Sequence, residues 1–129
     1  MSIVEQLARF LAKRLRLPFE GEDDGAVFFG YLPERPVKAV CVYTEDLRAG
    51  GDAAGTRIQV AVRSDLDGAW PLCVAAEIMQ ALDGGRDVML VPGGGCALRI
   101  EAEQGFEFSG MEGGAAQLYT ARFRVYYCP

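Results

Sequence analysis

A strand that runs directly into an amphipathic helix, over residues 56–82, constrains the fold of this chain most strongly. In the stretch Thr56–Arg63, Ile58, Val60 and Val62 alternate with more polar residues, as in a strand with one buried face. Cap-forming residues follow, and Trp70–Leu82 then has the apolar spacing of a helix. This pair of elements predicts a domain that contains both α and β structure.

The expected N-cap of this helix is Asp67, and its proline, Pro71, is tolerated because it falls in the first turn. We expect one apolar face on the helix, formed by Leu72, Ala75, Ala76, Met79 and Leu82.

The remaining periodicity predicts a first helix and several strands. Ser2 and Glu5 match a capping box, apolar residues then recur at helical spacing up to Leu15, and Pro18 ends the pattern. Strands are predicted over residues 27–32, 38–44, 97–103 and 117–127, and residues 87–91 are a further short candidate. We therefore expect a single domain over residues 1–129 of the α+β class: a mainly antiparallel sheet of four to five strands, with two helices packed on one face, in the order α-β-β-β-α-β-β.

Composition argues against several function classes. The formal net charge is −5 and the sequence pI is about 4.7, whereas a general nucleic-acid binder needs a basic surface. No apolar run is long enough to span a bilayer, and the first residues lack the order of a signal peptide, so we expect a cytoplasmic chain without membrane contact.

The residue types needed for common catalytic and metal sites are scarce. The chain has no histidine, which excludes Ser-His, Cys-His and His-metal sites, and its four cysteines form no CxxC pair. We expect reduced thiols, with Cys41 and Cys73 in the core and Cys128 exposed. The run Gly93–Gly95 lacks the rest of a phosphate-binding motif, and the acidic loop at residues 20–24 lacks the calcium-loop order. No catalytic residue, cofactor site or metal site is predicted.

Protein contacts are the better-supported function. The last strand carries Arg122, Arg124 and Tyr126 on the side opposite its apolar face, and Tyr and Arg are enriched at interfaces. A solvated outer face is the alternative interpretation. The further candidate interface residues are Phe28 and Tyr31 in the first strand, and Arg48 in the small-residue loop over 45–55.

Four segments together resemble a phage minor capsid and tail-terminator-like family. The stretch Val27–Pro36 matches its F-x-G-x-x-P-x-x-P opening, and the segments Ile58–Arg63, Ala75–Leu82 and Phe123–Tyr127 resemble the strand, helix and terminal strand that follow. The order and spacing match over most of the chain.

The resemblance implies a non-enzymatic structural protein of a phage or prophage. Such proteins form a ring, typically a hexamer, which caps the tail tube and joins it to the head. The implied partners are further copies of the chain, the tail tube protein and the head-tail connector protein, with no sequence-specific nucleic acid and no membrane. The implied location is the virion, and the host cytoplasm during assembly. The alternatives are another head-tail connector, neck or minor capsid protein, a small-ligand binding module, and a regulatory enzyme.

Overall fold

The computed structural model describes residues 1–44, 55–66, 68–113 and 116–128. Within these residues the chain forms two helices, α1 (Ile3–Leu15) and α2 (Trp70–Leu82). The strands are β1 (Ala26–Phe29), β2 (Ala39–Thr44), β3 (Thr56–Asp65), β4 (Arg86–Met89), β5 (Cys96–Glu112) and β6 (Ala116–Cys128). The chain is thus α+β, and neither of the described helices is long and apolar enough to cross a membrane.

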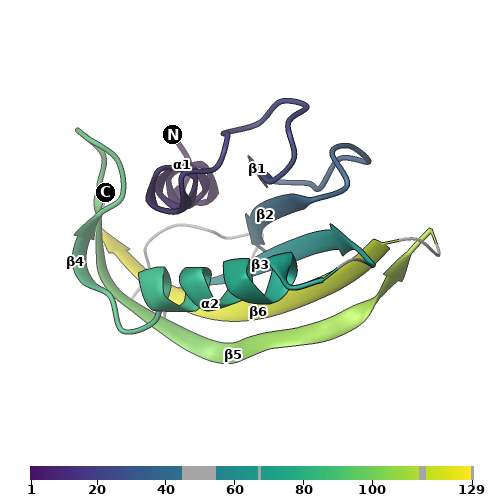
Figure 1. Cartoon of the computed structure of the whole chain (residues 1–129). Helices are drawn as coiled ribbons and strands as arrows, with labels where there is room; N and C mark the ends of the chain where they lie inside the picture. Colours follow the sequence, from purple (N-terminus) through teal and green to yellow (C-terminus); the bar gives the residue numbers. More distant parts are fainter. Residues whose placement is uncertain (45–54, 67, 114–115, 129) are drawn as a thin grey trace.

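The strands form one curled sheet that resembles half of a barrel (Figure 1). Their order is β1-β2-β3-β6-β5-β4; β1 and β2 run parallel, and the other neighbours run antiparallel. The prediction of a mainly antiparallel sheet of four to five strands is therefore wrong, because the described sheet is mixed and has six strands.

Two local features explain the difference. The segment between β1 and β2 contains Pro33 and Pro36, and it returns the chain to the end of the sheet where β1 began, so β2 pairs in parallel. The added strand β4 is a short edge strand that is mostly exposed, and its sequence carries only a weak pattern. Register shifts along β5 mark bulges, which increase the local twist and help the sheet to curl.

The first helix follows the predicted pattern closely. The Ser2 hydroxyl accepts a hydrogen bond from the Glu5 backbone N–H, and Arg16 ends the helix in the left-handed conformation. Leu7, Ala8 and Leu11 lie on its buried face. This face packs on β1 and β2, so α1 covers one end of the sheet.

The second helix has the predicted bounds but a different buried face. Ala69 is the N-cap and gives no side-chain hydrogen bond; Asp67, the predicted cap, lies outside the described residues. The buried residues are Pro71, Val74, Ala75, Ile78 and Leu82, whereas Leu72 is 62% exposed. Trp70 lies toward Gly25 and Lys38 at one end of the helix. This anchor is consistent with the helix being rotated so that the bulkier Val74 and Ile78, rather than Leu72, enter the core.

Both helices pack on the same face of the sheet, in one hydrophobic cluster that includes Val60, Phe123 and Ile100. We call the opposite side of the sheet the outer face. Cys41, Ala61 and Arg63 point to the outer face and are nevertheless buried. The segment 30–37 accounts for this burial because it folds back over β2 and β3.

The rotation of α2 makes a testable prediction. We expect Ile78→Ala to lower the free energy of unfolding by about 2–5 kcal/mol, since it opens a cavity beneath the helix. Leu72→Ala should change this free energy by less than about 0.5 kcal/mol, because its side chain is largely exposed. Urea unfolding measures both values; a larger loss for Leu72→Ala than for Ile78→Ala would mean that the face predicted from sequence is the buried one.

Candidate assembly surfaces

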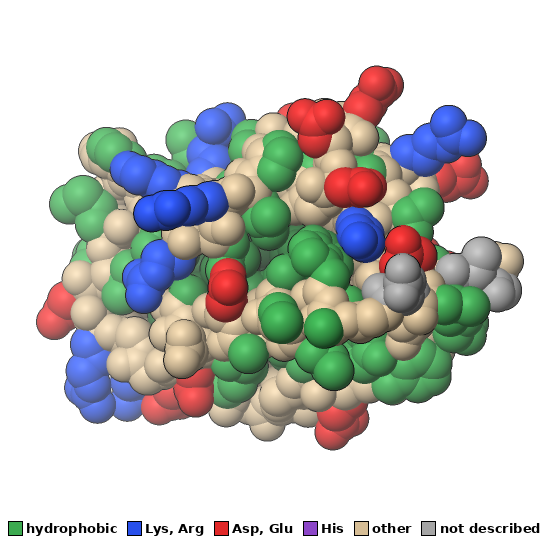
Figure 2. Space-filling view, in the orientation of Figure 1, with side chains coloured by type: hydrophobic (Ala, Val, Ile, Leu, Met, Phe, Trp, Pro, Cys, Tyr) green, Lys and Arg blue, Asp and Glu red, His purple; other side chains and the backbone are tan. Residues whose placement is uncertain are grey.

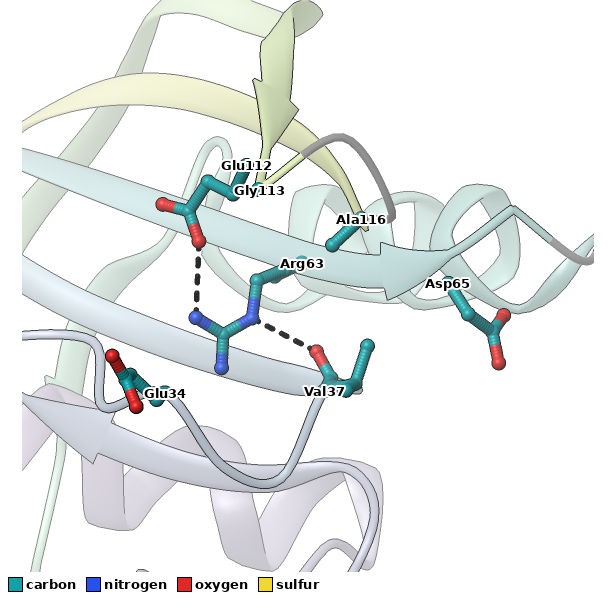
Figure 3. A pocket seen from close by; sticks show the side chains of 7 residues that line it. All are labelled: Glu34, Val37, Arg63, Asp65, Glu112, Gly113 and Ala116. Atoms are coloured by element: carbon teal, nitrogen blue, oxygen red, sulfur yellow. Dashed lines mark hydrogen bonds and ion pairs between the residues drawn. The ribbon is translucent and has the colours of Figure 1, made fainter.

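A buried arginine fixes the segment that covers the outer face. The Arg63 side chain, 5% exposed, donates from Nε to the Val37 carbonyl at 3.0 Å and from Nη2 to the carbonyls of Pro33 and Pro36. Its Nη1 pairs with Glu112 Oε2 at 3.1 Å. Figure 3 shows the guanidinium between the segment and the end of β5. Arg63 thus ties three separate parts of the chain together.

A shallow hollow of about 530 Å³ opens beside Arg63 (Figure 3). It is lined by Glu34, Val37, Arg63, Asp65, Glu112, Gly113 and Ala116. An arginine has five N–H groups, and four of those of Arg63 already bind the chain itself. This guanidinium therefore holds the fold together and has little capacity left to bind an anionic substrate.

The first group of predicted interface residues lies at the β1 end of the outer face. Phe28 is half-buried on β1, and Tyr31 just beyond the strand is 75% exposed. Tyr31 borders a second hollow of about 240 Å³, whose other lining residues are Gly30, Leu32, Tyr43, Ala61, Glu112 and Leu118. This region offers an apolar depression rimmed by two tyrosines, which is the composition expected of a protein contact.

The second group of predicted interface residues lies on β6, also on the outer face. Arg124 contacts Glu103 at 3.5 Å, and Arg57 contacts the same carboxylate at 3.1 Å. The hydrogen bond from Arg57, helped by the charge of Arg124, lowers the pKa of the Glu103 carboxyl. Arg122 is exposed on the same face.

Tyr126 is covered by a further cation on this face. The Arg99 guanidinium lies 4.3 Å from the centre of its ring and also pairs with Glu101 at 3.2 Å. The part of the outer face around β6 is therefore a network of paired charges.

The structure does not bring the two predicted groups into one patch. Strands β2 and β3 separate β1 from β6, so roughly 14 Å of sheet lies between Phe28 and β6. Tyr31 approaches β6 only near Leu118, which lines the same hollow, and this position lies before Arg122 along the strand. Arg48, the remaining candidate, lies outside the described residues.

An apolar surface on the helix side of the sheet was not predicted. Leu66 and Leu72 are 63% and 62% exposed, and Phe108 and Met111 on β5 are 56% and 45% exposed. Phe108 packs edge-on against Tyr119 at 5.7 Å, which fixes the ring in place. Figure 2 shows hydrophobic side chains gathered over the start of α2 and the distal part of the β5–β6 hairpin. The sequence pattern predicted that Leu72 lies in the core. This surface is therefore seen only in the structure, where α2 is rotated and Leu72 is exposed.

The thiols differ from expectation at one position. Cys41 is buried as predicted and Cys128 is exposed as predicted, but Cys73 is exposed on α2 because of the same rotation. Burial raises the pKa of the Cys41 thiol to about 12, although the nearby charge of Arg63 opposes the shift. Within the described residues, no three Cys, Asp or Glu side chains are grouped so that they could hold a metal ion.

Comparison with known proteins gives a match among solved structures. No protein-family model matches this chain, and no curated protein matches it. Among solved structures, a chain in the virion of the native gene transfer agent (GTA) particle has a similar fold, with a TM-score of 0.57 and 18% identity. The alignment covers 98% of this chain and 91% of that chain. At this identity the match shows a shared fold over nearly the whole of both chains. It supports the predicted resemblance at that level, while the tail-terminator family stays a prediction.

The role of Arg63 can be tested by substitution. We expect Arg63→Met to lower the free energy of unfolding by about 3 kcal/mol, because buried carbonyls lose their donor. Arg57→Met is the matched control: its side chain is 44% exposed, so its loss should cost less than about 1 kcal/mol. Urea unfolding at neutral pH measures both, and a small effect at Arg63 would show that the covering segment does not depend on this side chain.

The thiol environments predict a difference in reactivity. Thiol reagents attack through the thiolate, and a rise of the Cys41 pKa from 9.0 to about 12 reduces its thiolate fraction at pH 8 roughly a thousandfold. In the native chain we expect Cys73 to be modified before Cys41, which should resist, and in 8 M urea the two should react at similar rates. Peptide mass spectrometry after timed alkylation reports each site. Rapid native modification of Cys41 would contradict its burial.

Proposed function

We propose that this chain is a non-enzymatic structural subunit of a phage-like particle. In this proposal its copies form a ring at the head-proximal end of a tail, where the ring stops tube growth and presents a surface to the head connector. The observation that carries the proposal is the fold shared with a GTA virion chain over nearly the full length of both chains. A virion fold of this kind supports a role in assembly rather than in chemistry.

The distribution of surfaces agrees with this role. A subunit in a closed ring contacts each neighbour through two different patches, and a capping protein needs a further surface for the tube. This chain has an apolar surface on the helix side at Leu72 and Phe108, and a separate tyrosine-rimmed hollow on the outer face at Tyr31. Two apolar surfaces on opposite sides of one sheet fit a protein that is contacted from two directions.

The polar side chains of the described surface also favour an assembly role. The hollow of about 530 Å³ is built around Arg63, whose donors are engaged by the chain. Glu103, whose pKa is lowered, is held by two arginines. These groups are arranged to pair with each other rather than to transfer protons to a ligand.

Tube capping tests the proposal directly. The purified chain would be added to polymerising tail tube protein from the same particle, and tube lengths would be measured by negative-stain electron microscopy. We expect a ring of density at one tube end and elongation that stops. Binding to isolated head connectors without any effect on tubes would instead favour the neck or connector alternative, and binding to neither would contradict the assembly role.

A substitution on the helix-side apolar surface tests whether this surface contacts the tube. Leu72→Asp should weaken capping by roughly tenfold or more, because a carboxylate would have to be desolvated in an apolar contact. Cys73→Asp is the matched control, since Cys73 is also exposed and lies on the same helical turn. Equal capping by both variants would remove this surface from the proposed interface, and urea unfolding would check that both are folded.

A further inference from the structure

A basic groove lies between α1 and the turn that follows β4. It has a volume of about 500 Å³ and combines the cations Lys13, Arg14 and Arg16 with the apolar side chains of Phe10, Met89 and Pro92. Met89 is 65% exposed, so the apolar part of the groove is open to solvent. A groove with a partly apolar lining and a row of cations is suited to an anionic segment of protein.

The cations of this groove have no acidic partner within the described part of the chain. The ion pairs found there involve Arg9, Arg57, Arg63, Arg99 and Arg124. The cations Lys13, Arg14 and Arg16 are close in sequence and all exposed. Their repulsion is reduced by the C-terminal end of the helix dipole, and an anionic ligand would reduce it further.

The same chain carries a complementary segment. Glu20, Glu22, Asp23 and Asp24 are all exposed in the connection from α1 to β1, and no described cation pairs with them. In Figure 1 this connection lies on one side of α1, and β4 with its following turn lies on the other. Figure 2 shows cations gathered at the upper left and acidic side chains at the top of the same view. The two charged regions thus lie at separate places, on opposite sides of α1.

We infer that the acidic segment Glu20–Asp24 of one copy docks in the basic groove of the next copy. The contact is heterologous, because a segment on one side of α1 meets a groove on the other side of a neighbouring α1. Such contacts form a ring when the rotation between neighbours closes. A second copy fits the groove because it carries an exposed acidic segment that complements the cations locally. The inference rests on the proposed function, because the contact it describes is the one between neighbouring subunits of the proposed ring.

Charge exchange between two variants tests this contact. The groove variant is Lys13→Glu/Arg14→Glu, and the segment variant is Glu22→Lys/Asp23→Lys. Sedimentation velocity at low salt, over a concentration series, measures self-association. We expect wild-type association that weakens as salt is raised, and an association constant at least about tenfold lower for each variant alone. An equimolar mixture of the variants should associate again, because the reversed groove can bind the reversed segment, and the unchanged groove of the segment variant can bind the unchanged segment of the groove variant.

The controls separate this contact from general effects of charge and folding. Arg35→Glu/Arg86→Glu makes the same change in net charge at two exposed cations outside the groove lining, and it should associate like wild type. Rescue in the mixture also shows that both variants are folded. The inference is overturned if wild type does not self-associate, if the variants associate normally, or if the mixture fails to recover while both variants are folded. Tube capping is scored separately, so normal capping without this charge dependence would remove the contact and leave the proposed function standing.

Discussion

The buried guanidinium of Arg63 is the constraint on which the outer half of this molecule depends. A charged side chain placed beneath a covering segment must have its donors satisfied, and the carbonyls of Pro33, Pro36 and Val37 do so. The segment also needs Arg63. Its prolines have no N–H to pair with a strand, and its carbonyls would be buried without a hydrogen-bond donor if the guanidinium were absent. Sheet and segment are therefore stable only together, and β2 is placed parallel to β1 as a result.

The sequence predicts the elements whose structure depends mainly on a local pattern of apolar residues. The strict alternation of Thr56–Arg63 and the helical spacing of Trp70–Leu82 predicted both elements closely, because each pattern is decided by residues within a few positions. The parallel pairing could not be predicted in this way, because it depends on the path of the 30–37 segment. Arg63 alternates with apolar neighbours, and this pattern predicts a solvent-exposed side chain. In the structure, the side chain is instead buried.

The candidate surfaces, too, could be predicted only where they depend on a local period. The two-residue period of a strand predicts that Arg122, Arg124 and Tyr126 share a face. It does not predict that Glu103 contacts Arg124 or that Arg99 covers Tyr126, because both partners come from β5, whose register is altered by bulges. The apolar surface at Leu72 was missed because two overlapping apolar stripes on α2 compete for the core. The basic groove joins residues about 75 positions apart, at Lys13 and Met89, which only the curl of the sheet brings together.

The pairing of β6 has a consequence for how partners are recognised. Every residue of β3 from Thr56 to Asp65 is in register with β6, and β5 continues along the other side of β6 as far as Glu112. The distal hairpin is thus an extension of the central strands, and its apolar side chains are held by the same hydrogen-bond ladder as the core. Little conformational entropy remains to be lost there when a partner docks. Such a surface selects partners by shape rather than by folding around them, so a mismatch of a few ångströms is rejected instead of accommodated.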